Sequence, residues 1–332
     1  MIAALTLPVM LSATACAPVV VSAGASVRAP ELSGERYLAA DGTALPLAVW
    51  PAQGGAPKAV VLGLHGFGDY RDAFEEPAAI WSKDGITTYA YDQRGFGASP
   101  TRNRWPGTDT LVADAMTVAV LLRARYPGVP LYIAGESMGG AVALVGAERG
   151  MEGDGLILLS PALRSRASLG PIASAALFIL VHLIPWLPAG PTSIDFQPTD
   201  NPKTLEKLRK DPLMLRQPRF DMGYGLVNLM DAARDADAHL HVPYLMLHGM
   251  GDRIVPGDAV RSAISVMPRR ADSRVGFYKN GYHLLLRDKE GPQVAADVAI
   301  WIHDHETPLP SGADVDKSQP EIARLWGSKR PP

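Results

Sequence analysis

The chain has 332 residues, of which 47% are hydrophobic, and its 32 Lys and Arg against 34 Asp and Glu give a net charge of -2. This composition excludes an intrinsically disordered chain and allows a large buried core, either one α/β domain with an insertion or about two domains. Because the charge is balanced and the sequence has no basic stretch, nucleic acid is not an expected partner. The single cysteine, Cys16, excludes an internal disulfide framework and a multi-cysteine metal site.

The N-terminus has the pattern of an export signal. Residues 2–15 are almost wholly apolar and end in Ala13-Thr14-Ala15, a small-residue cleavage pattern, directly before Cys16. This resembles a bacterial lipoprotein signal, in which the cysteine becomes the lipidated first residue. No Lys or Arg precedes the apolar run and Ala13 stands where such signals usually carry Leu, so a plain secretory signal and an uncleaved anchor stay open. We predict a signal peptide over 1–15, lipidation at Cys16 and a tether over 16–32.

The strand signals begin with a hairpin, in which Tyr37–Ala40 and Leu45–Trp50 flank Asp41-Gly42-Thr43. Short, continuous apolar runs then predict strands that are buried on both faces. These runs are Lys58–Leu64, Ile86–Tyr91, Pro130–Ala134, Gly155–Leu159, Pro243–Leu247 and Arg274–Tyr278. Helical patterns separate most of them, at Leu111–Arg125, Ser137–Arg149, Asp258–Val266 and Val294–His305. This alternation predicts a mostly parallel, eight-stranded sheet with helices on both faces.

One long segment breaks the alternation. Residues 162–240 contain no strand-like run and are first apolar and Pro-rich, then charged. We interpret them as a helical cap over the carboxyl ends of the strands, where open α/β sheets bind ligands. Within the cap, Leu169–Leu187 is long enough for a transmembrane helix, but its internal prolines favour a cap helix that faces the active site or a membrane surface. The core is then 33–161 and 241–306, followed by a polar, weakly ordered tail over 307–332.

A candidate nucleophile lies in Gly135-Glu136-Ser137-Met138-Gly139, between a predicted strand and a predicted helix. This is the G-x-S-x-G nucleophile elbow in the strand-turn-helix context that it requires. Glycines allow the sharp turn that would present Ser137, although a glycine-rich turn with a capping serine would also fit the five residues alone. Ser137 is the predicted nucleophile.

Three further loops supply the rest of a serine hydrolase site. His65-Gly66-Phe67-Gly68 follows the first long buried strand, so the backbone N–H groups of Phe67 and Met138 are the predicted oxyanion donors, with His65 bracing the loop. Asp252 and His283 follow later strands and complete the chain order Ser, Asp, His that is typical of α/β-hydrolases. His283 is the predicted base, and Asp252 is predicted to orient it.

At these positions the chain resembles the α/β-hydrolase superfamily, and within it the monoacylglycerol lipase and lysophospholipase group. The matching pieces are HGFGDY at 65–70, YDQRGFGAS at 91–99, GESMGG at 135–140, LLSPALR at 158–164, LHGMGDRIVP at 247–256 and GYHLLL at 281–286. The resemblance implies an α/β-hydrolase fold and a serine hydrolase that needs neither cofactor nor metal. It also implies a substrate class, the carboxylic esters of single-chain lipids.

The sequence therefore predicts a lipid-ester hydrolase that acts through an acyl-enzyme and is anchored in the bacterial cell envelope through lipidated Cys16. The cap is a possible second membrane contact. A secreted or periplasmic protein is the alternative location. Two alternative functions stay open: a broad small-ester esterase or thioesterase, and a non-catalytic binding protein with a hydrolase fold.

Overall fold

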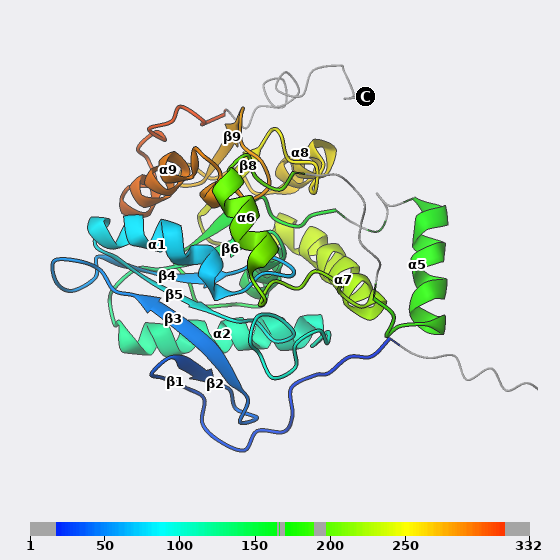
Figure 1. Cartoon of the computed structure of the whole chain (residues 1–332). Coiled ribbons are helices and arrows are strands. Elements are labelled where there is room, and N and C mark those ends of the chain that lie inside the picture. Colours follow the sequence, from blue (N-terminus) through cyan, green and yellow to red (C-terminus); the bar gives the residue numbers. More distant parts are fainter. Residues whose placement is uncertain (1–17, 165, 167–169, 189–196, 316–332) are drawn as a thin grey trace, which may run out of the picture.

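The computed structural model describes residues 18–164, 166, 170–188 and 197–315 and contains one central sheet (Figure 1). Its nine strands hydrogen-bond in the order β1-β2-β3-β5-β4-β6-β7-β8-β9. They are Glu31–Ser33 (β1), Arg36–Leu38 (β2), Ala44–Trp50 (β3), Ala59–Leu64 (β4), Ile86–Tyr91 (β5), Leu131–Glu136 (β6), Gly155–Leu159 (β7), Tyr244–Gly249 (β8) and Arg274–Tyr278 (β9). β1, β2, β3 and β5 pair antiparallel in turn, whereas β5, β4, β6, β7, β8 and β9 pair parallel.

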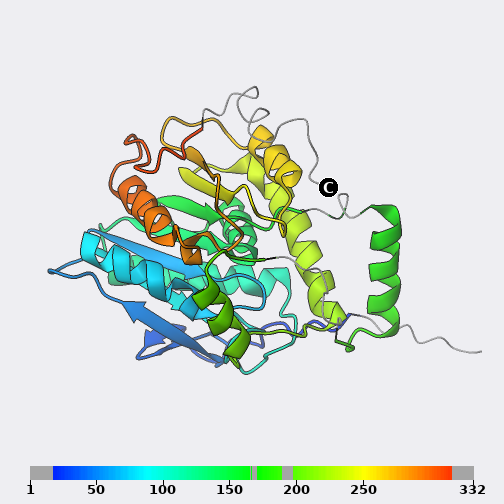
Figure 2. The same cartoon turned by 45° about the horizontal axis from the view of Figure 1, so that its top comes forward.

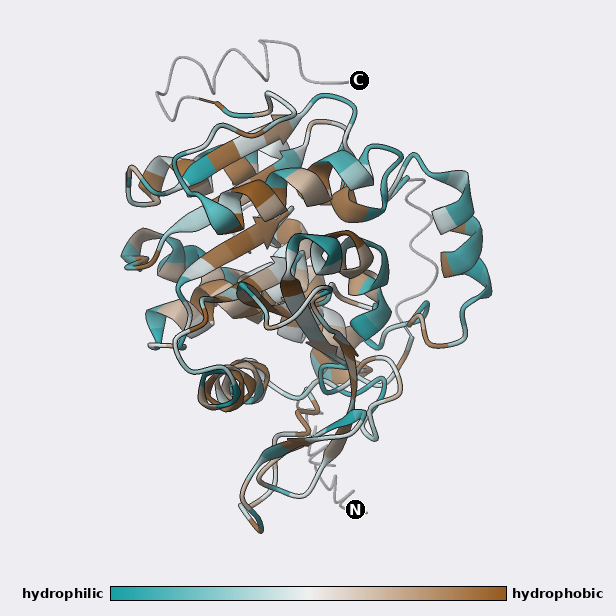
Figure 3. Cartoon of the chain, turned by 90° about the vertical axis from the view of Figure 1, so that its left-hand side faces the viewer, coloured by the Kyte–Doolittle hydropathy of each residue, from teal (hydrophilic) through white to brown (hydrophobic). Residues whose placement is uncertain are grey.

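The mostly parallel sheet is confirmed, but it has nine strands where eight were predicted. The additional strand is β1, which has three residues and lies at the edge of the sheet. Every residue of β4, β5, β6, β7 and β8 is buried, as expected for parallel strands that are covered by helices on both faces. Figure 3 shows brown, hydrophobic stretches within the central sheet and in the helices beside it.

Helices cover both faces of the sheet. α1 (Glu75–Trp81) and α9 (Gly291–His303) pack on one face, and α2 (Thr108–Arg125), α3 (Met138–Glu148) and α8 (Gly257–Val266) pack on the other. Successive residues of β4 reach opposite layers, since Val60 belongs to the second layer and Val61 to the first. Short 3-10 helices lie at Arg71–Phe74 (η1), Ser82–Asp84 (η2), Asp237–His239 (η3) and Leu285–Arg287 (η4).

The described parts of the segment predicted as a cap include three α-helices with different surroundings. These are α5 (Pro171–Leu183), α6 (Pro202–Lys210) and α7 (Phe220–Ala236). α7 belongs to the main core through Met222, Leu229 and Ala233, whereas α5 stands at the edge of the molecule beside α7, with Val181 as its buried residue (Figures 1 and 2). Over the part of the chain that the structure describes, no helix is long and apolar enough to cross a bilayer.

The intervening part of this segment crosses the carboxyl edge of the sheet. The Leu215 amide donates to the Gly68 carbonyl at 2.8 Å, in the loop after β4, and the Leu284 amide donates to the Pro198 carbonyl at 2.9 Å, in the loop after β9. Residues 197–215 therefore lie over the loops in which the sequence places the site.

Both predicted terminal segments are more closely attached to the core than expected. Residues 18–32, the described part of the predicted tether, hydrogen-bond to the core, for example from the Val21 amide to the Trp105 carbonyl at 2.8 Å, and end in β1. The tail prediction is wrong for 307–315, where Leu309 is buried and the Phe277 amide donates to the Ala313 carbonyl at 2.9 Å. The predicted signal peptide, Cys16 and residues 316–332 lie outside the described residues.

Candidate active site

Ser137 lies on a strained turn between β6 and α3. Its φ of 51° and ψ of -112° are unusual for a residue with a side chain, and such a conformation costs about 1–3 kcal/mol unless its surroundings hold it. Backbone bonds hold it on both sides, from the Ser137 amide to the Leu159 carbonyl and from the Ala162 amide to the Ser137 carbonyl, each at 2.9 Å. The serine is therefore fixed at the N-terminus of α3, where the helix dipole favours negative charge.

The glycines of the elbow allow three backbone segments to meet. A Cβ on Gly139 would lie 1.9 Å from the Leu64 carbonyl oxygen, and one on Gly135 would lie 2.4 Å from the Gly139 oxygen. A Cβ on Gly66 would lie 3.4 Å from the Cβ of Ser137. The loop after β4 is thereby placed directly against the nucleophile elbow.

Asp252 and His283, from the loops after β8 and β9, form a buried pair. His283 Nδ1 lies 2.7 Å from Asp252 Oδ2. The other carboxylate oxygen, Oδ1, accepts from the amides of Ile254 at 2.7 Å and Val255 at 3.0 Å. The two loops also touch directly, because the Gly251 amide donates to the Gly281 carbonyl at 2.8 Å. Both oxygens of Asp252 thus have defined partners, which fixes the carboxylate plane against the imidazole.

The ionisation of this pair defines the tautomer of His283. Burial would raise the pKa of Asp252, but the charge of His283 and its hydrogen bond hold that pKa below its ordinary value. An ionised carboxylate can only accept, so Nδ1 carries the shared proton and Nε2 is the nitrogen that can take a second one. Burial opposes charge on His283 as well, yet Asp252 raises the pKa of His283 above its ordinary value.

The two predicted oxyanion donors come from the nucleophile elbow and from the loop after β4. Met138 is the first residue of α3, so its amide has no acceptor within the helix. Phe67 lies next to Gly66 in the loop after β4, and its ring packs edge-on against Phe96 with centroids 5.3 Å apart. Both amides therefore belong to the segments that meet at Ser137.

His65 has the bracing position that its sequence context predicts. The Gln93 amide donates to His65 Nε2 at 3.0 Å, so Nδ1 carries the proton and donates to the Gly66 carbonyl at 2.8 Å. Burial lowers the pKa of His65, which keeps the ring neutral. The ring links the loop after β4 to the loop after β5.

Sequence analysis missed three charged residues that meet beside the site. Arg287 Nη2 lies 2.6 Å from both Asp69 Oδ2 and Glu136 Oε1, and all three side chains are buried. Asp69 and Glu136 lie inside the HGFGDY and GESMGG motifs, and Arg287 follows GYHLLL. Opposite charges within three motifs that share one site are the signal that could have revealed the cluster.

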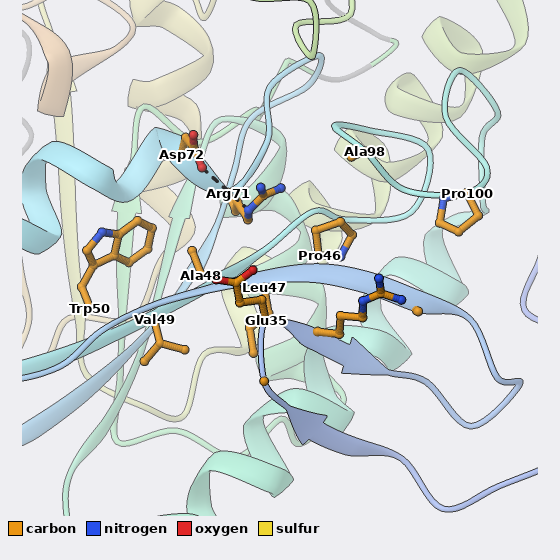
Figure 4. A pocket seen from close by; sticks show the side chains of 13 residues that line it. Glu35, Pro46, Leu47, Ala48, Val49, Trp50, Arg71, Asp72, Ala98 and Pro100 are labelled. Carbon is orange, nitrogen blue, oxygen red and sulfur yellow. Dashed lines mark ion pairs between the residues drawn. The ribbon is translucent and has the colours of Figure 1, made fainter.

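A surface hollow elsewhere does not contain the site. It runs along β3 between Trp50, Arg71 and Pro100, and the ion pair of Arg71 with Asp72 forms part of its lining (Figure 4). None of the predicted site residues lines it. The reactive groups gather instead at the carboxyl ends of β4, β6, β8 and β9.

Comparison with known proteins agrees with this geometry. Residues 55–290 match the Hydrolase_4 family, described as serine aminopeptidase, S33. The chain belongs to this family. It is 31% identical over 273 residues to the monoglyceride lipase of Homo sapiens, covering 79% of this chain and 88% of the relative. It is 26% identical over 253 residues to the monoacylglycerol lipase of Mycolicibacterium smegmatis, covering 75% of this chain and 89% of the relative.

Solved structures confirm the predicted α/β-hydrolase fold. A monoacylglycerol lipase of Paleococcus ferrophilus superposes with a TM-score of 0.64 at 23% identity, covering 79% of this chain and 99% of that one. A soluble variant of the monoglyceride lipase of Saccharomyces cerevisiae, in complex with a substrate analogue, gives 0.68 at 20% identity and covers 88% and 100%. At these identities, the likeness establishes the fold of this chain and nothing further.

Proposed function

We propose that this chain is a serine hydrolase that cleaves the carboxylic ester of monoacylglycerol-like, single-chain lipids through an acyl-enzyme. The observation that carries the proposal is the buried 2.7 Å contact of His283 Nδ1 with Asp252, on the same sheet edge as the strained Ser137. The curated relatives named monoglyceride lipase support the substrate class.

Each residue of the proposed triad has one role. Ser137 Oγ attacks the ester carbonyl and passes its proton to His283 Nε2, which later gives that proton to the leaving alcohol. Asp252 holds the ring in the required tautomer and stabilises the imidazolium. A water molecule then attacks the acyl-enzyme, with the same proton transfers through His283, and releases the fatty acid.

The tetrahedral intermediate needs donors for its negative oxygen. The amides of Phe67 and Met138 are the proposed pair, because they belong to the two segments that meet at Ser137. Such a donor is worth on the order of 10²-fold or more in rate. Since both are backbone groups, the positions of the segments matter more than the two side chains.

The decisive experiment uses Ser137→Ala on the purified chain. A fluorophosphonate should label the wild type and not the variant, and ester hydrolysis should fall by on the order of 10⁵-fold or more with the fold intact. Turnover that persists in Ser137→Ala would overturn the catalytic assignment. A wild type that neither labels nor turns over any ester would favour the alternative of a non-catalytic binding protein.

We further propose that a membrane surface presents the substrate. Twelve large apolar side chains are exposed within the described ranges, and nine of them lie in 19–27 or 172–187. The nine are Val19, Val20, Val27, Ile172, Phe178, Ile179, Leu183, Trp186 and Leu187. An exposed apolar surface of this kind suits the interface of a bilayer.

The two segments lie on the same side of the molecule. Val21 bonds to Trp105, which packs against Gly225 of α7, and the Phe220 amide at the start of α7 donates to the Leu187 carbonyl at 3.1 Å. The start of the described chain, the dark-blue end of the ribbon, therefore lies close to α5 (Figure 1). A lipid on Cys16, two residues earlier, would enter the same bilayer that the apolar side of α5 contacts.

Two measurements test this membrane arrangement. A fatty-acid analogue should label the wild type and not Cys16→Ser, and the mature chain should begin at residue 16. For the chain lacking residues 1–16, Phe178→Ser combined with Leu183→Ser should reduce binding to phospholipid vesicles, whereas Val266→Ser, at another exposed apolar position, on α8, should not. A soluble mature chain that retains residues 1–15 would refute the anchor without affecting the catalytic proposal.

A further inference from the structure

The buried cluster of Arg287, Glu136 and Asp69 joins the three segments of the candidate site. Glu136 directly precedes Ser137, Asp69 lies two residues after Phe67, and Arg287 lies four residues after His283. One guanidinium nitrogen, Nη2, contacts both carboxylates at 2.6 Å. The elbow, the oxyanion loop and the loop that bears the base are therefore tied together at one atom.

The cap holds the same arginine from the other side. The Arg287 carbonyl accepts from the hydroxyls of Thr199 at 3.2 Å and Thr204 at 3.0 Å. Next to it, Asp288 Oδ2 accepts from the Tyr282 amide at 2.7 Å, which fixes the backbone before His283. A movement of the cap at Thr204 would thus displace the backbone of the loop that bears His283.

The cluster places two buried carboxyl groups against one guanidinium. Burying an uncompensated charge is costly, so an arrangement of this kind suggests a functional reason. The charge becomes more nearly balanced when His283 takes up the serine proton. Glu136 is thus a second carboxylate, besides Asp252, whose field favours the imidazolium.

We propose that Glu136 and Arg287 are positioning residues that hold the nucleophile elbow against the base loop and set, with opposite signs, the protonation of His283. This inference rests on the proposed triad. The charged and titratable groups that act on His283 include Asp252, Glu136, Arg287 and the neighbouring His248, and Asp69 contacts Arg287 in the same cluster. Burial lowers the pKa of His248 to about 4, so it stays neutral in the working range.

The electrostatics of the individual groups agree with these signs. Burial opposes charge on His283, Asp252 and Glu136 raise its pKa, and Arg287 lowers it. Burial raises the pKa of Glu136, while the Arg287 charge opposes that rise and the 2.6 Å contact favours the ionised form. Removing the charge of Glu136 alone should therefore lower the pKa of His283, and removing the charge of Arg287 alone should raise it.

The test is the acid limb of kcat/KM against pH on a soluble short-chain ester. Glu136→Gln keeps the size of the side chain and removes its charge, so the midpoint should move to lower pH by about half a unit or more. Arg287→Gln should move it to higher pH. The double variant should return it close to the wild-type value, because one charge of each sign is then absent.

The matched control is Asp114→Asn in another buried trio, where Arg94 contacts Asp41 at 2.8 Å and Asp114 at 2.6 Å. Asp41 lies in the hairpin turn between β2 and β3, Arg94 in the loop after β5, and Asp114 in α2. None of these three elements bears a residue of the proposed triad. Asp114→Asn should lower the melting temperature and leave the acid limb in place. It separates a general loss of stability from an effect on the base.

An acid limb that stays at the wild-type midpoint in Glu136→Gln, while Ser137 still reacts with the fluorophosphonate, would overturn the inference and leave the triad standing. Turnover in Ser137→Ala would instead overturn the triad. If Arg287→Gln fails to fold, the acid limbs of Glu136→Gln and of the double variant test the inference. The double variant is the more stable of the two Arg287 variants, because it leaves only Asp69 without the guanidinium, whereas Arg287→Gln leaves both Asp69 and Glu136.

Discussion

Asp252 presents Oδ2 to His283 Nδ1 at 2.7 Å while Oδ1 accepts from two backbone amides of its own loop. The carboxylate cannot rotate without losing these bonds, so the imidazole is oriented by backbone geometry as well as by charge. The same contact with Asp252 raises the pKa of His283.

We expect the acid limb of kcat/KM to lie above the reference histidine pKa of about 6.5. His283 must be neutral to accept the serine proton, and Asp252 raises its pKa despite burial, so activity is lost at a higher pH than for a free histidine. Asp252→Asn should lower both the midpoint and the plateau rate. A variant with near-normal kcat/KM at all pH values would mean that another residue orients His283.

The second prediction concerns the packing of the elbow. A Cβ on Gly139 would lie 1.9 Å from the Leu64 oxygen and 2.9 Å from the His65 oxygen, and neither backbone atom can move without displacing the end of β4. Gly139→Ala should therefore cost about 3 kcal/mol in urea unfolding and prevent labelling of Ser137.

Gly223→Ala is the matched control for this prediction. Gly223 lies in α7, and a Cβ there would meet nothing within 4 Å. Replacing a helical glycine at such a position should stabilise the fold by about 0.5–1 kcal/mol. Equal effects of the two substitutions would show that the close approach at Gly139 is not a constraint.

The parallel strands and the members of the triad could be predicted from the sequence because each has a local signal. Strands buried on both faces are continuous apolar runs, and Ser137, Asp252 and His283 each follow such a run. Short or isolated elements lack that signal. α1 has seven residues, too few to show a helical period, and the docking of Leu309 on the core depends on backbone bonds to β9 that composition does not reveal.

The charged cluster was missed for a different reason. Asp69, Glu136 and Arg287 lie in or directly after motifs of the site, but long stretches of sequence separate them, so the motifs do not show which charges pair. Only the order β4, β6, β7, β8, β9 in the sheet brings their loops to one edge. The sequence likewise does not distinguish α7, which belongs to the core, from α5, which stands beside it.

The third prediction concerns Asp237, which is fully buried at the end of the cap segment. Its Oδ2 accepts from Arg234 at 3.1 Å, while its Oδ1 has no hydrogen-bond partner among the residues described. Burial raises its pKa from 3.8 to about 7, with Arg234 opposing.

The pH dependence follows from that shift. The unfolded chain loses this proton near pH 4 and the folded chain near pH 7, so Asp237 makes the fold progressively less stable as pH rises through this window. Asp237→Asn should raise the melting temperature relative to wild type above pH 7, by the equivalent of about 1 kcal/mol or more, and the gain should vanish near pH 4. A gain that is the same at both pH values would show that Asp237 is not protonated in the folded state.

The last prediction separates the two sides of α5. Leu177 is half-buried and packs toward the core, whereas Phe178, the next residue, is 52% exposed. If the acyl chain lies between α5 and the core, kcat/KM should rise from acetyl to at least octanoyl esters, by about fourfold for each buried methylene until the pocket is full. Leu177→Ser should flatten that rise and spare acetyl-ester turnover, because the triad lies in the core.

Phe178→Ser serves as the neighbouring control, since its side chain faces away from the core. It should leave the chain-length profile on soluble esters unchanged and weaken vesicle binding. The profile is measured below the concentration at which the esters aggregate, so that binding to a lipid surface cannot imitate binding in a pocket. A wild-type profile that peaks at acetyl and falls with chain length would refute the lipid-ester assignment and favour the small-ester esterase, because a site built around alkyl contacts cannot prefer the substrate that lacks them.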